Sequence, residues 1–131
     1  MTVRGKQPSD PRNSPLTREV LLSFWKVHIL HHAAEGTVYG QWMMDELRRH
    51  GYDISPGTLY PLLRRMDSHG WLELVNAETR SIHSRKEYRL TKLGAAALDL
   101  IRTQLQELSS EVIEKKRAGR RPIKPTRTGG Q

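Results

Sequence analysis

The chain has 131 residues, of which 36% are hydrophobic and 27% charged, and it contains no cysteine. This length fits one domain with short extensions, the lack of cysteine excludes disulfides and thiolate metal sites, and no apolar run reaches the ~18 residues that a membrane span needs. The formal net charge is +8. Because no apolar stretch follows the basic N-terminal residues, we expect no secretory signal and a cytoplasmic protein.

The positive charge is concentrated at the two ends of the chain. Residues 115–131 hold seven basic side chains and no acidic one, whereas residues 16–114 hold 12 basic and 13 acidic ones. Proline and glycine interrupt both ends, so we expect disordered segments over 1–15 and 117–131. The basic tail is either solvated or adds non-specific contacts to nucleic-acid phosphates. The function of the body must therefore be sought in the placement of its residues, not in its net charge.

Two helices are expected in the first part of the body. Ser14-Pro15 has the form of an N-cap followed by proline at the first helical position, which predicts a helix over about 16–34. A second helix is expected over about 38–50, with Gly51 as its stop. The apolar residues expected to pack are Val20, Leu21, Phe24, Val27 and Leu30 in the first helix and Trp42, Met43 and Leu47 in the second.

A third helix is expected over about 56–69, because Ser55-Pro56 repeats the cap-and-proline pattern and Gly70 follows as a stop. Helical spacing gathers its apolar side chains on one face and small, hydroxyl and guanidinium groups on the other. The apolar face consists of Leu59, Leu62, Leu63 and Met66. The opposite face consists of Gly57, Tyr60, Pro61, Arg64, Arg65 and Ser68.

Two strands and a long helix complete the body. Strands over about 71–75 and 85–90, with a polar connection that contains Arg80, predict a two-stranded ribbon with a basic tip. Thr91 can cap a last helix over about 92–116. Its apolar residues follow the 3-4-3-4 spacing of a coiled-coil seam, namely Leu98, Ile101, Leu105, Leu108 and Val112. This stripe packs either on its own domain or, as we favour, on a partner chain.

The order of these elements predicts a mainly α winged helix-turn-helix, with three helices and a two-stranded β-wing over residues 16–90 and a C-terminal dimerisation helix over 91–116. In this fold the third helix enters the major groove. Small residues at its start permit close approach, its N-terminal amides attract phosphate, and arginine pairs with guanine through two hydrogen bonds. The partner expected from this pattern is double-stranded DNA.

The stretch from Ile54 to Met66 resembles the recognition-helix signature of PadR-type transcriptional regulators. Further parts of that pattern occur in the same order, namely Tyr39-Gly40, Gly70-Trp71-Leu72, the run from Arg85 to Thr91, and Gly94. The resemblance covers roughly residues 24–112, and the single C-terminal helix is similar to the family's shorter type. It implies a homodimeric winged-helix repressor that binds an inverted-repeat operator and responds to a small-molecule effector.

The fold and the resemblance together predict the site residues. Tyr60 is expected on a DNA phosphate, as the resemblance implies, and Trp25 either contacts a flat organic effector or belongs to the core. The predicted DNA-binding residues are Ser55, Pro56, Gly57, Thr58, Tyr60, Arg64, Arg65, Ser68, Arg80, Arg85 and Lys86. The predicted dimerisation residues are Leu98, Ile101, Leu105, Leu108 and Val112.

Two other classes of function are compatible with parts of the sequence. His28, His31 and His32 have the helical spacing that can bring imidazoles together around zinc or nickel, which would make the chain a metal-responsive regulator. No carboxylate stands at the offset that a helical His-Glu-x-x-His motif needs, so a structural or solvated role is favoured and no cofactor is predicted. A winged helix that contacts only proteins would show no preference for duplex DNA. No catalytic motif is recognisable, so we expect no enzyme.

Overall fold

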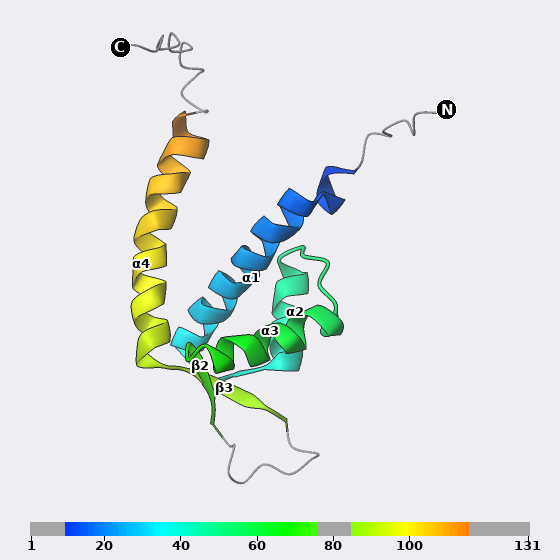
Figure 1. Cartoon of the computed structure of the whole chain (residues 1–131), viewed down its shortest axis with the longest axis vertical. Coiled ribbons are helices and arrows are strands. Elements are labelled where there is room, and N and C mark those ends of the chain that lie inside the picture. Colours follow the sequence, from blue (N-terminus) through cyan, green and yellow to red (C-terminus); the bar gives the residue numbers. More distant parts are fainter. Residues whose placement is uncertain (1–9, 76–84, 116–131) are drawn as a thin grey trace, which may run out of the picture. The chain divides into compact units, whose positions relative to one another are not determined.

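The structure is a computed structural model that describes residues 10–75 and 85–115 (Figure 1). Arg80 lies outside the described residues. So do residues 1–9 of the segment predicted to be disordered over 1–15, and the whole segment predicted to be disordered over 117–131. The chain divides into two compact units, Met1–Leu98 and Asp99–Gln131. This division falls inside the last helix, whereas the predicted domain boundary lies before that helix, between residues 90 and 91.

The first unit starts earlier than predicted, because residues 10–15 are not a disordered extension. A short 3-10 helix, η1 (Pro11–Asn13), is capped by Asp10, whose carboxylate accepts a hydrogen bond from the Arg12 backbone N–H at 3.0 Å. The long helix α1 (Pro15–Glu35) follows directly. Its N-cap is Ser14, as predicted, because the Ser14 hydroxyl oxygen accepts a hydrogen bond from the backbone N–H of Thr17 at 3.1 Å.

The buried face of α1 differs from the predicted one. Trp25, Ile29 and Leu30 are buried, whereas the side chains of Val20 and Phe24 are 41% and 40% exposed. Apolar residues occur on more than one side of this helix, so spacing alone does not select the face. The choice is made by packing, because α1 contacts β3 and α2.

A two-residue strand, β1 (Val38–Tyr39), precedes α2 (Gly40–Arg49), so the second helix begins later than predicted. The two residues are extended because they pair with β3, at Val38 opposite Tyr88. Met43 and Leu47 are buried in α2 as expected, but the Trp42 side chain is 46% exposed.

The turn between α2 and α3 (Pro56–Ser68) is closed by backbone geometry. Gly51 has a φ of 93°, in the left-handed region that favours glycine, and the Tyr52 N–H donates to the Leu47 carbonyl at 3.1 Å. The Arg48 guanidinium also donates to the Ile54 carbonyl at 3.2 Å. These bonds fix where α3 begins. The predicted apolar face of α3 is confirmed, since each of its four residues is 0% exposed: Leu59, Leu62, Leu63 and Met66.

The wing consists of β2 (Leu72–Leu74) and β3 (Glu87–Leu90), which are antiparallel with Leu74 opposite Tyr88. With β1 they form a three-stranded sheet in the order β1-β3-β2. The predicted two-stranded ribbon is therefore extended by β1, which is too short to show an alternating pattern in the sequence. Tyr88 is buried between its two neighbours, so the sheet closes one side of the core.

The last helix, α4 (Lys92–Ser109), continues into a π-helical turn, η2 (Ser110–Glu114). Thr91 caps it as predicted, because the Gly94 N–H donates to the Thr91 hydroxyl oxygen at 3.0 Å. Leu98 is 2% exposed and belongs to the core of the first unit. The predicted dimerisation stripe is therefore wrong at Leu98, whose side chain is already covered by its own chain.

Within residues 10–75 and 85–115, no helix combines the length and the hydropathy that a membrane span requires.

Candidate nucleic-acid interface

The outer side of α3 carries the predicted DNA-binding residues away from the core. Tyr60, Arg64 and Arg65 are exposed, opposite the buried leucines of the same helix. At the start of α3, Ser55 occupies the N-cap position and its hydroxyl donates to the Thr58 hydroxyl oxygen at 3.3 Å. The residues placed on this side are Ser55, Pro56, Gly57, Thr58, Tyr60, Arg64, Arg65 and Ser68.

The outer side of α3 and the start of the second wing strand share a depression of about 290 Å³. Segments distant in the sequence meet there, namely the β1–α2 junction, α3 and the residues leading into β3. None of the described residues that line it is acidic, and three of them are basic. The lining consists of Tyr39, Gly40, Gln41, Tyr60, Arg64, Arg85, Lys86 and Tyr88.

The β1–α2 junction supports the two sides of this depression. The ring of Tyr60 packs so closely on Gly40 that a Cβ at this position would overlap the ring. The guanidinium carbon of Arg85 lies 4.2 Å from the ring centroid of Tyr39, a cation–π contact that orients the arginine. Tyr39 and Gln41 were not among the predicted site residues, although Tyr39-Gly40 formed part of the motif that carried the resemblance.

Three cations on this surface have no acidic partner among the described residues. Among the described residues, Arg64, Arg65 and Lys86 form no ion pair, whereas Arg89 pairs with Glu73 at 2.6 Å. Exposed cations without acidic partners can exchange their counterions for phosphate oxygens, which is the main source of affinity for DNA. We call this surface the α3–wing face and define it by the described members of the predicted set: Ser55, Pro56, Gly57, Thr58, Tyr60, Arg64, Arg65, Ser68, Arg85 and Lys86.

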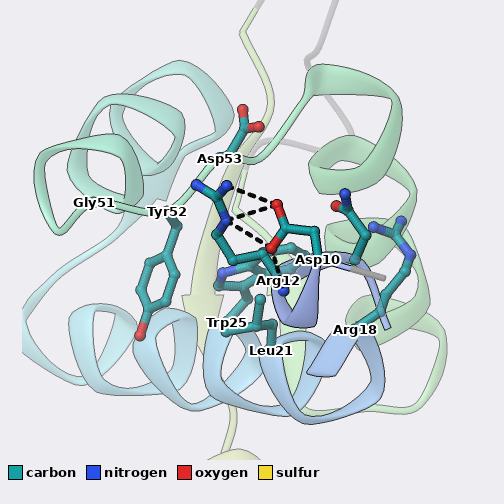
Figure 2. A pocket seen from close by; sticks show the side chains of 9 residues that line it. Asp10, Arg12, Arg18, Leu21, Trp25, Gly51, Tyr52 and Asp53 are labelled. Atoms are coloured by element: carbon teal, nitrogen blue, oxygen red, sulfur yellow. Dashed lines mark hydrogen bonds and ion pairs between the residues drawn. The ribbon is translucent and has the colours of Figure 1, made fainter. Parts of the chain in front are cut away.

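Trp25 lies in the core and borders a second hollow, of about 640 Å³ (Figure 2). Its ring is 3% exposed and meets Tyr52 edge-on, with the ring centroids 6.0 Å apart. Its indole N–H has no hydrogen-bond partner among the described residues. This burial favours the core role for Trp25 over a freely accessible stacking platform.

The walls of this hollow come from η1, α1 and the turn before α3. Figure 2 shows Arg12 lying against Asp10, with a 2.6 Å ion pair that holds the pKa of the Asp10 carboxyl below its ordinary value. Arg18 and Asp53 add further charge, from α1 and the turn respectively. A ligand in this hollow would therefore touch the segment that positions α3.

The structure places the three histidines predicted as one group on α1 in two groups that share His32. His31 is exposed and its Nε2 lies 3.4 Å from a Glu35 carboxylate oxygen. His28 and His32 instead lie beside His50, the residue that ends α2. His50 was missed because it is distant in the sequence, and only the packing of α2 on α1 brings it near.

Comparisons with known proteins identify the family of this winged-helix chain. The family model described as "Transcriptional regulator PadR-like family" matches residues 29–100. The chain is 46% identical over 98 residues to the transcriptional regulator Rv3488 of Mycobacterium tuberculosis, covering 73% of this chain and 89% of that protein.

Solved structures show the same fold. A PadR-like transcriptional regulator from Bacillus cereus is 25% identical with a TM-score of 0.63, over 82% of this chain and 100% of that one. A PadR family regulator from Eggerthella lenta is 27% identical with a TM-score of 0.56, over 81% and 95% of the two chains. The predicted mainly α winged-helix fold is confirmed, and the family is one of regulators, which is not an enzyme class. The chain belongs to the PadR-like family of transcriptional regulators.

Proposed function

We propose that the chain is a sequence-specific repressor that binds an inverted-repeat operator as a homodimer. The observation that carries this proposal is the α3–wing face, where Arg64, Arg65 and Lys86 are exposed without ion-pair partners among the described residues, beside a helix with small residues at its start. A winged-helix domain of this kind presents its third helix to the major groove. Family membership supports regulation of transcription through DNA.

Each group on the face has a role in the proposed complex. Arg64 and Arg65 project from the outer side of α3, where a guanidinium can hydrogen-bond a guanine edge or a phosphate. Tyr60, held by Gly40, donates its hydroxyl to a phosphate. Arg85 and Lys86, at the base of the wing, contact the adjacent DNA backbone. Backbone contacts set the register of the helix, and base contacts supply the sequence preference.

Homodimer formation is supported by apolar side chains that a single chain leaves exposed. In the second unit, Leu105, Leu108 and Val112 are 38%, 53% and 55% exposed, and with half-buried Ile101 they keep the seam spacing that the sequence predicted. A second copy of the chain covers this stripe. Two-fold symmetry then sets the two α3 helices about one helical turn of DNA apart, ~34 Å.

A response to a small organic effector is supported by the hollow beside Trp25. Charged side chains line this hollow, and a ligand that binds there would displace the Asp10–Arg12 pair. Because Gly51–Asp53 also line the hollow, such a ligand would act on the turn before α3 and change affinity for DNA.

A repressor of this kind works where bacterial DNA lies, in the cytoplasm.

Selection of genomic fragments by the purified protein, followed by footprinting, tests the proposal. We expect enrichment of one family of inverted repeats whose half-sites are about 10 base pairs apart between centres. A Tyr60→Ala, Arg64→Ala double variant, run in parallel, should enrich no sequence. If the unaltered protein enriches no sequence over random fragments, sequence-specific repression is contradicted and the protein-contact alternative is favoured.

A further inference from the structure

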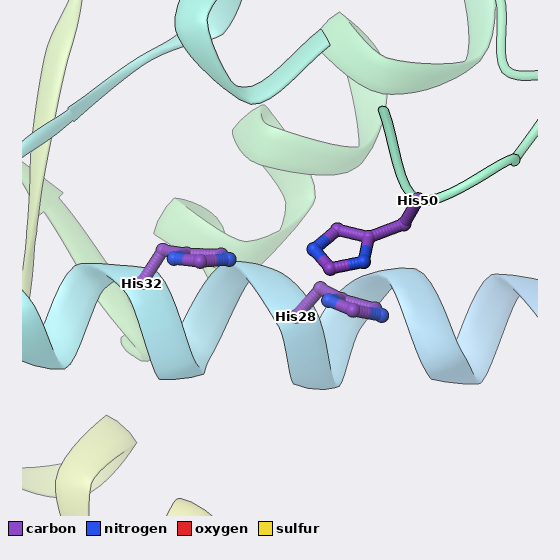
Figure 3. A group of neighbouring side chains, drawn as sticks. All are labelled: His28, His32 and His50. Atoms are coloured by element: carbon purple, nitrogen blue, oxygen red, sulfur yellow. The ribbon is translucent and has the colours of Figure 1, made fainter. Parts of the chain in front are cut away.

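A cluster of imidazoles lies between α1 and the end of α2. Figure 3 shows His28 and His32 along α1, with His50 reaching toward them from the start of the turn before α3. One ligand atom from each of these three histidines lies within 4.8 Å of the others. The ring centroids of His28 and His50 are 5.0 Å apart.

A buried carboxylate completes the cluster. Glu46 is 8% exposed, and its Oε2 lies 3.4 Å from the Nε2 of His32 and 3.0 Å from the Nε2 of His50. Arg49 donates to both oxygens of this carboxylate, to Oε1 at 2.9 Å and to Oε2 at 2.8 Å. A metal ion at Oε2 would therefore take the place of the second of these hydrogen bonds.

We propose that His28, His32, His50 and Glu46 bind one divalent transition-metal ion of the zinc and nickel class. Imidazole nitrogens with one carboxylate are the ligands this class prefers, whereas magnesium and calcium prefer oxygen alone. Around a tetrahedral zinc ion with ligands at about 2.0–2.1 Å, neighbouring ligand atoms lie about 3.4 Å apart. The ligand atoms of the three histidines lie within 4.8 Å of one another, so they must move closer to reach that spacing, and the 41% exposed side chain of His50 has room to move.

A second carboxylate orients one imidazole of the cluster. The Nδ1 of His32 lies 3.2 Å from a Glu35 carboxylate oxygen, and a carboxylate in this position fixes the ring so that Nε2 is presented to the ion.

A second group, His31, His32 and Glu35, also brings its ligand atoms within 4.8 Å of one another. It is the weaker candidate, because all three side chains come from one helix and Glu35 is 62% exposed. The His28–His32–His50 group instead joins two helices and includes a buried carboxylate. Since both groups contain His32, variants of the other residues distinguish them.

The test uses the untagged full-length chain, because a polyhistidine tag binds the same ions. After treatment with a chelator, the chain is titrated with Co²⁺, followed by its visible absorption, and with Zn²⁺, followed by calorimetry. We expect one ion per chain. His28→Ala and His50→Ala should each weaken binding about a hundredfold, and Glu46→Gln about tenfold, since each removes a ligand.

A matched control is available in His69→Ala. His69 is exposed and stacks on Trp71, outside the cluster, so its removal should leave the affinity unchanged. Zn²⁺ should also raise the Tm of the unaltered chain but not that of His50→Ala, since binding to the folded state alone stabilises it. His50 lies at an exposed helix end, so this variant tests the site even if His28→Ala does not fold.

Three results would overturn the assignment. These are no binding by the unaltered chain, unchanged affinity in His50→Ala, or loss of binding in His31→Ala with retention in His50→Ala, which would move the ion to the exposed group. The measurements read metal binding directly, so they succeed or fail independently of the proposed repressor function.

Discussion

The two units of the chain treat their apolar residues in opposite ways. In the first unit, α3 buries its whole apolar face, and Leu98 closes the core from the start of α4. In the second unit, the same helix continues with Leu105 and Leu108 exposed. The first unit therefore forms its own core and the α3–wing face within one chain, whereas the second leaves apolar residues exposed, which the proposed dimer would cover. Recognition and dimerisation should thus respond differently to mutation.

The largest expected effect is at Leu98, the last residue of the first unit. Leu98→Ala should lower the free energy of unfolding by about 2–5 kcal/mol, because it leaves a cavity in a closed core. Leu108→Ala should act only through the dimer, so its loss of Tm should be absent at concentrations where both chains are monomeric and should grow to a constant value as protein concentration rises. Thermal unfolding of both variants at two concentrations checks this difference. A concentration-independent loss in Leu108→Ala would break the comparison.

Introduction of a charge into the exposed stripe tests dimerisation itself. Leu105→Lys should weaken self-association about a hundredfold, since an unpaired charge in an apolar contact costs on the order of 3 kcal/mol. The folded first unit should persist, with unchanged helical content. Gln104→Lys adds the same charge at the neighbouring exposed position and serves as the control. Sedimentation velocity that shows an intact Leu105→Lys dimer would remove this stripe from the interface.

Within the first unit, Gly40 tests whether Tyr60 must lie where the structure places it. The added methyl group of Gly40→Ala would overlap the Tyr60 ring and displace it from the α3–wing face. We expect DNA affinity to fall about tenfold, equivalent to ~1.4 kcal/mol. Gly36→Ala is the control, because a Cβ there meets nothing within 4 Å. Equal anisotropy titrations of the two variants would show that the position of Tyr60 does not matter.

The smallest effect is expected from the basic residues beyond the described part of the chain. Truncation after Lys116 removes five basic residues, so affinity for any DNA should fall a few-fold and depend less steeply on salt. The ratio of affinities for operator and random DNA should stay the same, because these residues have no assigned contact with bases. Identical salt slopes for the two chains would show that the tail takes no part.

The recognition helix could be predicted from the sequence because its signals are local. Ser55-Pro56 marks the start of the helix, and a single clean stripe of four apolar residues marks its buried face. The outward direction of Arg64 follows from that stripe. The capping of α1 by Ser14 and of α4 by Thr91 was likewise predictable from neighbouring residues.

The features that could not be predicted depend on packing between distant segments. Helix α1 is apolar on several sides, so its contacts with β3 and α2, not its spacing, select Trp25 over Phe24 for the core. Strand β1 has two residues and exists because β3 pairs with it. The histidine cluster needs His50, which reaches His28 only when α2 packs on α1.

The most direct test of the account is the preference of Arg64→Ala for the selected operator over a scrambled duplex, measured by fluorescence anisotropy. If Arg64 contacts a base edge from the α3–wing face, this preference should fall by about 1–3 kcal/mol. Arg102→Ala, which removes an exposed arginine from α4, should keep the preference. An unchanged preference in Arg64→Ala would contradict the claim that this face reads DNA.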